Sequence, residues 1–140
     1  MNLRLRASTV VVYENQLLTF LAEDPHNGRE FFFLPGGQIE KHETAPEAAV
    51  RETLEETGYH IEVETISAID SEYDFFWNGQ THHCLTLFYR GSLTSPFATP
   101  AKVAACDYHK KVVWLPLDQI KERLSYSPAV LQATLELLKR

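Results

Sequence analysis

The sequence predicts a single α/β domain in which helices cover a mixed β-sheet. The 140 residues are close to the commonest size of one domain, and a 44% apolar share is enough to build a core. Strand patterns surround one central helix, and a helical segment ends the chain, so the regular alternation of a doubly wound sheet is missing. We therefore expect residues 1–140 to form one domain.

The first third of the chain has the pattern of β-strands. Residues 3–13 alternate and then become continuously apolar, Glu14-Asn15 marks a turn, and residues 16–22 predict a second short strand. A third strand, rich in phenylalanine, is expected over residues 30–34. Pro35-Gly36-Gly37 follows directly and should end that strand.

Residues 45–57 predict the central helix. Thr44 can accept a hydrogen bond from the first turn, and Glu47, three residues later, completes a capping box. Pro46 is tolerated in a first turn, and Gly58 suits the left-handed position that often follows a last turn. The helix should therefore be short and well delimited.

Two further strands are expected over residues 61–71 and 81–93. The aromatic and polar stretch between them, residues 73–80, contains the turn signal Asn78-Gly79. These strands should follow the helix and extend the sheet.

The end of the chain combines a loop, a strand and a helical tail. A proline-containing loop over residues 95–107 leads to a last strand over residues 111–115. Residues 117–140 have helical patterning, with a break expected at Ser127-Pro128 because proline suits a helix start better than its middle.

Charge and hydropathy narrow the class of protein. A net charge of −6 argues against a general nucleic-acid binder, which usually presents a basic face. No stretch approaches the roughly 18 apolar residues of a membrane span, and a secretory signal is missing, so we expect a cytoplasmic protein without a membrane partner. Cys84 and Cys106 form no metal-type pair and are expected to be buried free thiols rather than a disulfide.

The central helix carries an acidic stripe. On a helical wheel Leu54 lies near Val50, whereas Glu52, Glu55 and Glu56 fall together on the opposite side. Like charges at these spacings destabilise a helix unless a bound cation compensates them. The helix alone fits a solvated surface helix and a metal site equally well.

The loop before the helix favours the metal site. Gly36 and Gly37 let the backbone approach a ligand closely and can offer it a carbonyl oxygen. Carboxylate and carbonyl oxygens are hard ligands, which suit Mg²⁺ or Mn²⁺ better than zinc.

Residues 37–59 resemble the Nudix box, the motif of the MutT-like Nudix hydrolases. The motif is a glycine, five residues, a glutamate, seven residues, then Arg-Glu-aliphatic-x-Glu-Glu-x-Gly-aliphatic, and every fixed charged residue and glycine is present. Thr53 and Tyr59 stand where an aliphatic residue is usual, and weaker similarities lie at residues 33–36 and 114–118. The resemblance implies the Nudix fold, an α/β/α sandwich around a mixed β-sheet.

The resemblance also implies an activity, the metal-dependent hydrolysis of a phosphoanhydride bond in a nucleoside diphosphate linked to another moiety. By resemblance, Glu52, Glu55 and Glu56 bind Mg²⁺ or Mn²⁺, with the carbonyl of Gly37 as a further ligand. Glu52 or Glu55 would also act as the catalytic base, and the sequence leaves that choice open.

Arg51 is the remaining catalytic candidate. It could pair with Glu55 one turn on or with Glu43 at the loop end of the helix, and the resemblance gives it the role of orienting the carboxylates. An ordinary helix salt bridge is the alternative interpretation.

Many Nudix enzymes take one more acid from a loop shortly before the last strand. Asp107 is the only acid between Gly91 and Trp114, so it is the candidate here. A plain loop aspartate is the competing interpretation.

The aromatic stretch bears on the substrate. Phe75, Phe76 and Trp77 could stack on a base, although packing in the core or a hairpin is the commoner role of such a cluster. Phe75 and Phe76 stand where ADP-ribose hydrolases carry a marker proline and dinucleoside polyphosphate hydrolases a marker tyrosine. The absence of both markers favours a nucleoside triphosphate or a less common nucleotide.

Two histidines are further candidates for substrate binding. His82 and His83 are adjacent on an expected strand, so they should point to opposite faces of the sheet. Only one of them can reach the site, where a neutral hydrogen-bonding role is expected.

Two other classes of function stay open. A catalytically silent Nudix-like domain could bind or sense a nucleotide, although such domains usually lose glutamates that this chain retains. A protein-interaction role, such as a homodimer, would use the apolar stripe of the last helix, which could equally cover the sheet. The residues of that stripe are Val130, Leu131, Leu135 and Leu138.

Overall fold

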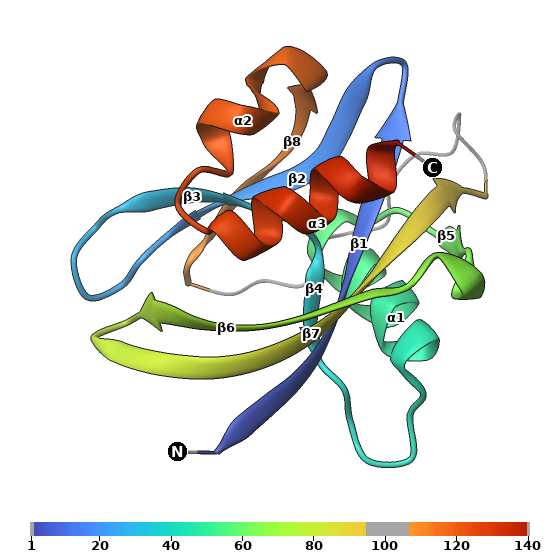
Figure 1. Ribbon diagram of the computed structural model, residues 1–140. Coiled ribbons are helices and arrows are strands. Elements are labelled where there is room, and N and C mark those ends of the chain that lie inside the picture. Colours follow the sequence, from blue (N-terminus) through green and yellow to red (C-terminus); the bar gives the residue numbers. More distant parts are fainter. Residues whose placement is uncertain (1, 95–106, 140) are drawn as a thin grey trace.

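The computed structural model describes residues 2–94 and 107–139 of the chain (Figure 1). These residues form eight strands linked by backbone pairing, together with the helices α1 (Ala45–Thr57), α2 (Ile120–Arg123) and α3 (Pro128–Leu138). Two 3₁₀ turns, η1 (Thr65–Ser67) and η2 (Leu117–Gln119), lie between them. The strands are β1 (Leu3–Tyr13), β2 (Gln16–Glu23), β3 (Glu30–Phe33), β4 (Gly36–Gln38), β5 (Ile61–Val63), β6 (Ile69–Trp77), β7 (Gln80–Leu93) and β8 (His109–Pro116).

The sheet is mixed, as predicted. Strands β1 and β7 run parallel at its centre, with Ala7 opposite Leu87, and every other pairing of the described strands is antiparallel. The other edge of β1 pairs first with β4, over Arg6 to Ser8, and only at Val12 and Tyr13 with β2. The sheet therefore divides along β1, and β4 brings the glycine loop to the middle of the molecule.

Helices cover both faces of the sheet. In Figure 1, α1 lies behind β1 and β7, whereas α3 crosses in front of them. The α3 side holds the largest buried cluster, which includes Val10, Phe88, Leu115, Ile120 and Leu137. Smaller clusters pack α1 against the opposite face, one of them around Ala7, Ala48, Ala49 and Tyr89. The expected α/β/α arrangement is confirmed.

The ends of α1 follow the prediction. The Thr44 side chain accepts a hydrogen bond from the Glu47 N–H at 3.2 Å, and the Glu47 carboxylate accepts one from the Thr44 N–H at 2.9 Å. Gly58 ends the helix in the left-handed conformation, at φ 80°. Both caps satisfy backbone groups that a helix terminus would leave unpaired.

The buried side of α1 differs from the wheel prediction. The fully buried residues are Ala48, Ala49, Thr53 and Thr57, while Val50 on the expected apolar side is only half-buried. The small alanine side chains let the helix approach β1 closely. The helix is therefore rotated about its axis relative to the wheel prediction, and part of the acidic stripe faces inward. The stripe is thus not opposite the buried side.

The two departures from the Nudix box have structural partners. Thr53 is fully buried, and its hydroxyl lies 2.9 Å from the hydroxyl of Thr9 on β1. The hydroxyl of Tyr59 accepts a hydrogen bond from the indole N–H of Trp114 at 3.2 Å. At both positions, where an aliphatic residue is usual, the side chain therefore packs and also makes a hydrogen bond to a neighbouring strand.

Several element boundaries differ from those predicted. The expected strand over residues 61–71 is interrupted by η1, because Ser67 turns back to hydrogen-bond the carbonyl of Glu64. Strand β6 continues through residues 73–77, which were expected to join two strands. The turn at Asn78-Gly79 is confirmed by φ values of 52° and 76°. Strand β4 was not predicted at all.

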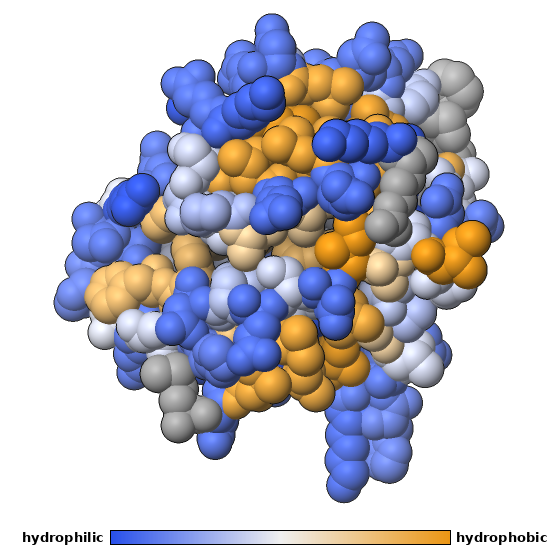
Figure 2. All heavy atoms as spheres, in the orientation of Figure 1, coloured by the Kyte–Doolittle hydropathy of each residue, from blue (hydrophilic) through white to orange (hydrophobic). Residues whose placement is uncertain are grey.

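The tail matches its prediction more closely. Ser127 caps α3 by accepting a hydrogen bond from the Val130 N–H, and Pro128 occupies the first turn. The apolar stripe of α3 packs on the core beneath it, and Figure 2 shows apolar side chains gathered at the surface over α2 and α3. None of the helices in the described residues is long and apolar enough to cross a membrane.

Only one of the two cysteines, Cys84, lies within the described residues. Cys84 is buried and has a free thiol, as predicted. Cys106 lies outside the described residues, as does nearly all of the loop expected over residues 95–107.

Candidate active site

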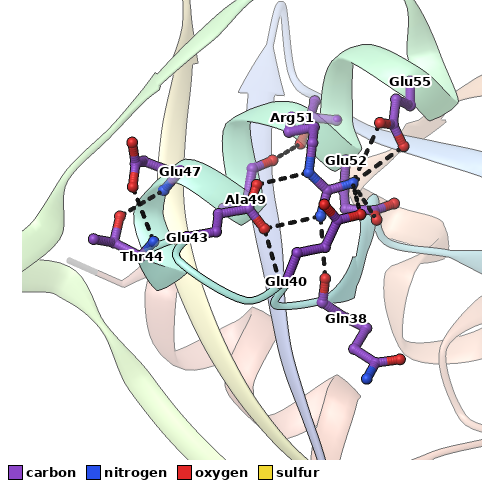
Figure 3. A network of polar contacts seen from close by, with 10 residues as sticks. Gln38, Glu40, Glu43, Thr44, Glu47, Ala49, Arg51, Glu52 and Glu55 are labelled. Atoms are coloured by element: carbon purple, nitrogen blue, oxygen red, sulfur yellow. Dashed lines mark hydrogen bonds and ion pairs between the residues drawn. The ribbon is translucent and has the colours of Figure 1, made fainter.

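Arg51 is the centre of a network that joins α1 to the loop before it (Figure 3). Its guanidinium donates two hydrogen bonds to the Glu43 carboxylate, at 2.7 and 3.0 Å, and one to the Gln38 carbonyl at 3.1 Å. The Nη1 group lies 2.9 Å from Glu52 and 3.2 Å from Glu55. Arg51 therefore contacts both expected partners, Glu43 and Glu55, and reaches Glu52 as well.

The bidentate pair with Arg51 sets the charge of Glu43. These hydrogen bonds, with a further one from the Glu40 backbone, lower the pKa of Glu43 from 4.5 to about 2. Glu43 stays ionised at any physiological pH, so it holds Arg51 in one orientation.

Glu52 lies directly against the backbone of β4. A methyl group built on Gly37 would be 2.5 and 2.7 Å from the two carboxylate oxygens of Glu52, which is far inside van der Waals contact. Glycine is thus required at position 37 because the Glu52 carboxylate lies so close to the backbone there. Burial raises the pKa of Glu52, and the hydrogen bond from Arg51 opposes that shift.

Glu56 is the most deeply placed carboxylate of the stripe. Its side chain accepts a hydrogen bond from the Gly36 N–H at 2.7 Å, and its backbone carbonyl lies 2.7 Å from the imidazole of His109 on β8. Burial raises the pKa of Glu56 well above its usual value, against the opposing effect of the Gly36 hydrogen bond. A buried carboxylate of this kind needs a cation to be stable in its charged form.

The donor set fits a hard divalent cation. Glu52 and Glu56 offer carboxylate oxygens beside the backbone of Gly37, and Gly37 has no side chain to fill that space. Among residues 2–94 and 107–139, however, no three His, Cys, Asp or Glu side chains gather closely enough to hold a metal ion. Glu55 turns toward Arg51 and is 45% exposed, so the guanidinium is the cation between Glu52 and Glu55.

A cavity of about 340 Å³ opens beside these carboxylates. Glu52, Glu56, Gly36 and Gly37 line one part of it. Another part is an aromatic wall, formed by Phe33, Phe75, Trp77, Tyr108 and Tyr126.

The aromatic wall includes two of the predicted substrate residues. Phe75 and Trp77 alternate along β6 and face the cavity, and the ring of Trp77 lies 5.3 Å from that of Phe33. Phe76 points to the other face and is 54% exposed. The three aromatic residues thus divide between a cavity wall and an open surface.

The two histidines separate as predicted. His82 lines the cavity, with its Nε2 atom 3.2 Å from the Trp77 carbonyl. His83 lies on the opposite face between Asp74 and Glu72, whose hydrogen bonds raise its pKa.

Asp107 is not among the residues that line the cavity. Its side chain is exposed, and the next residue, Tyr108, contributes to the aromatic wall instead.

Several residues of the cavity were not singled out from the sequence. Arg4 and Arg6 on β1 and Tyr73 on β6 all line it. The alternation of arginine with leucine over residues 3–6 places both arginines on one face of a strand, and this pattern could have identified them. Phe33 on β3 and Tyr126 in the turn between α2 and α3 are distant in sequence, and only the fold brings them together.

Comparisons with known proteins agree with this architecture. The family model described as NUDIX domain matches residues 3–134. A protein of Mycobacterium tuberculosis (strain CDC 1551 / Oshkosh) named "Putative mutator protein MutT4" is 31% identical over 118 residues, which are 80% of this chain. The match covers 43% of that relative's length.

Solved structures share the fold. A NUDIX hydrolase from Nitrosomonas europaea superimposes with a TM-score of 0.75 at 22% identity, covering 99% of this chain and 90% of the other. An Ap4A hydrolase from C. elegans superimposes with a TM-score of 0.73 at 15% identity, covering 97% and 96% of the two chains. With the family model matched over almost the whole chain, the protein belongs to the Nudix hydrolase family.

Proposed function

We propose that this protein hydrolyses a phosphoanhydride bond in a nucleoside triphosphate or a related nucleoside diphosphate derivative, using Mg²⁺ or Mn²⁺. One observation carries the proposal: a single cavity has the carboxylates of Glu52 and Glu56 in one part and an aromatic wall in another. The reacting phosphate and the base of a nucleotide need these two kinds of surface.

The carboxylates Glu52, Glu55 and Glu56, with the Gly37 carbonyl, would hold the cation. Bound there, Mg²⁺ or Mn²⁺ would neutralise the charge that spreads over the phosphoryl oxygens during hydrolysis. To join this set, Glu55 has to turn inward from its exposed position, which requires Arg51 to release it.

Arg51 would act by orienting the carboxylates. Its two bonds to Glu43 and its bond to the Gln38 carbonyl fix the guanidinium independently of Glu55. Arg51 can therefore release Glu55 and still keep Glu52 aimed at the site. Either Glu52 or Glu55 would accept the proton of the attacking water.

The aromatic wall would bind the base. Phe75 and Trp77 line the cavity, and His82 lies near them as a hydrogen-bonding group. The Nudix marker residues for ADP-ribose and dinucleoside polyphosphates are both missing from this chain, which supports a nucleoside triphosphate. The name of the mycobacterial relative is consistent with a mutator-type nucleotide hydrolase.

A substrate panel tests the proposal. The purified protein should be incubated with Mg²⁺ or Mn²⁺ and with nucleoside triphosphates, nucleotide sugars, ADP-ribose and dinucleoside polyphosphates, and the products should be separated by ion exchange. We expect turnover of at least one nucleoside triphosphate, which chelation by EDTA abolishes. Binding without turnover across the panel would instead identify a sensor domain.

Variants of the stripe assign the activity to this site. Glu52→Gln, Glu55→Gln and Glu56→Gln should each lower the rate by orders of magnitude, because each removes a charged donor. Glu62→Gln, on the exposed side of β5, is the matched control and should retain the wild-type rate. Hydrolysis in oxygen-18 water would then show which phosphorus is attacked.

A further inference from the structure

Arg6 is a cation that lines the cavity, and its side chain has no hydrogen bond to another described side chain or backbone group. Its Nε atom is buried and has no hydrogen-bond acceptor, and it is the only such buried side-chain nitrogen or oxygen in the described part of the chain. The described residues also give the Arg6 guanidinium no ion pair within 4.0 Å. Arginine N–H groups that lose water without gaining an acceptor destabilise a fold, so this arrangement favours an acceptor supplied by a ligand.

The sheet register places Arg6 between the two working parts of the cavity. On one side of β1 it pairs with Gln38 of β4, next to Gly37. On the other side it pairs with Thr86 of β7, whose hydroxyl lies 2.9 Å from the hydroxyl of Tyr73 on β6. Strand β6 then continues into Phe75 and Trp77 of the aromatic wall.

The pKa shifts of neighbouring groups also indicate that Arg6 lies between the carboxylates and the aromatic wall. Burial raises the pKa of both Glu52 and Glu56, and the charge of Arg6 opposes the shift in both. Burial likewise raises the pKa of Tyr73 and Tyr126, and Arg6 again opposes it. The positive charge is therefore near the carboxylates and near the tyrosines of the aromatic side.

We infer that Arg6 binds the phosphate nearest the nucleoside, donating hydrogen bonds to its non-bridging oxygens. The inference rests on the proposed function, because it takes the base to lie on the aromatic wall and the scissile phosphate at the carboxylates. A nucleotide that spans these two parts would have its first phosphate between them, where Arg6 lines the cavity. Guanidinium groups suit phosphate oxygens because their donors are paired in a planar fork.

Arg4 supports this role from the mouth of the cavity. It lies two residues before Arg6 on the same face of β1 and also lines the cavity, but it is exposed. Its contribution should be a general attraction for anions that weakens with salt, whereas Arg6 should discriminate between a phosphate and no phosphate.

The test compares binding of nucleoside monophosphates with that of their nucleosides. AMP, GMP, CMP and UMP and the four nucleosides are titrated by calorimetry in EDTA, so that neither metal nor turnover is involved. We expect wild type to bind at least one monophosphate about tenfold or more tightly than its nucleoside, as hydrogen bonds to charged groups imply. Arg6→Gln should lose most of this preference and keep the nucleoside affinity.

Matched variants complete the design. Arg6→Lys keeps the charge and should retain part of the preference, and Arg123→Gln, an exposed arginine of α2, should retain all of it. Thermal melting should show that Arg6→Gln is folded, so that a lost phosphate preference is not a loss of structure. A wild type without phosphate preference, or an Arg6→Gln variant that keeps it, would overturn the inference. An inactive substrate panel would refute the proposed function instead, and the EDTA titrations would still decide the role of Arg6.

Discussion

The carboxylate of Glu52 occupies the space in which any side chain at position 37 would have to lie. A Cβ atom on Gly37 would come within 2.7 Å of both Glu52 oxygens. Helix α1 and the short strand β4 can therefore lie close together only because residue 37 has no side chain. This close approach positions the Glu52 carboxylate beside the cavity.

Gly37→Ala should accordingly lower the activity about 100-fold while leaving the protein folded. The methyl group has to push Glu52 aside, and a misplacement of about 1 Å at a reacting centre costs about 100-fold in rate. Steady-state kinetics and circular dichroism measure the two effects. Gly28→Ala is the control, because a methyl group there meets no atom within 4 Å, and only the left-handed backbone is strained. A fully active Gly37→Ala enzyme would show that Glu52 acts from another position.

Glu43 should make the protein sensitive to acid. Its pKa is about 2 in the folded state against an ordinary 4.5, so the unfolded chain binds the proton more tightly. The stability that comes from Glu43 is fully present above pH 4.5 and is lost as the pH falls toward 2. Chemical denaturation across this range should show a shallower loss of stability for Glu43→Gln than for wild type. An identical slope for the two proteins would mean that the pair with Arg51 does not form in solution.

The same variant should weaken catalysis in a particular way. Without the bidentate carboxylate, Arg51 loses its anchor and swings between Glu52 and Glu55, so the affinity for Mg²⁺ should fall about 10- to 100-fold, as for other residues that orient metal ligands. Excess Mg²⁺ should restore much of the rate.

The sequence predicted the chemistry of the site better than its geometry. The capping box, Gly58 and the charge pattern of residues 37–59 are local, so the ends of α1 and two partners of Arg51, Glu43 and Glu55, could be predicted from spacing. The inward turn of α1 did not follow from spacing, because the wheel was oriented on Val50 and Leu54 and gave no sign that Ala48 and Ala49 are buried. The small side chains of α1 let the helix approach β1, and that contact depends on residues distant in sequence, such as Thr9, which is 44 positions from Thr53.

The residues that line the cavity could likewise be predicted only in part from the sequence. The alternation of Tyr73, Phe75 and Trp77 was visible in the sequence, but not that Phe33 and Tyr126 would meet them. Asp107 was the candidate because it is the only acid between Gly91 and Trp114, whereas the next residue, Tyr108, is the one that lines the cavity. Side-chain direction at the end of a loop is set by tertiary packing and not by sequence spacing.

Neighbouring aromatic residues of β6 provide a direct test of base binding. Trp77→Ala should raise KM about tenfold or more with a smaller change in kcat, since stacking of a base on an aromatic ring contributes about 1–3 kcal/mol. Phe76→Ala removes a neighbouring aromatic ring from the exposed face and should leave both constants unchanged. Equal effects of the two substitutions would argue that the wall acts through stability and not through contact with the base.

The buried carboxylate of Glu56 should lower the stability of the metal-free protein. Burial raises its pKa well above 4.5, so the folded protein holds the proton more tightly than the unfolded chain does. The stability of the metal-free protein should therefore fall as the pH rises from 4.5 toward the raised value. Glutamine is neutral at every pH, and its side-chain oxygen can still accept the hydrogen bond from the Gly36 N–H.

Glu56→Gln should consequently melt at a higher temperature than wild type in EDTA at about pH 8, with the difference vanishing near pH 4. Saturating Mg²⁺ should narrow the gap at high pH, because a cation stabilises only the carboxylate. Glu62→Gln, exposed on β5, should follow the wild-type curve throughout. A Glu56→Gln protein that melts below wild type in EDTA at high pH would mean that the buried carboxylate is already compensated by the protein, and that Glu56 is structural and not a metal ligand.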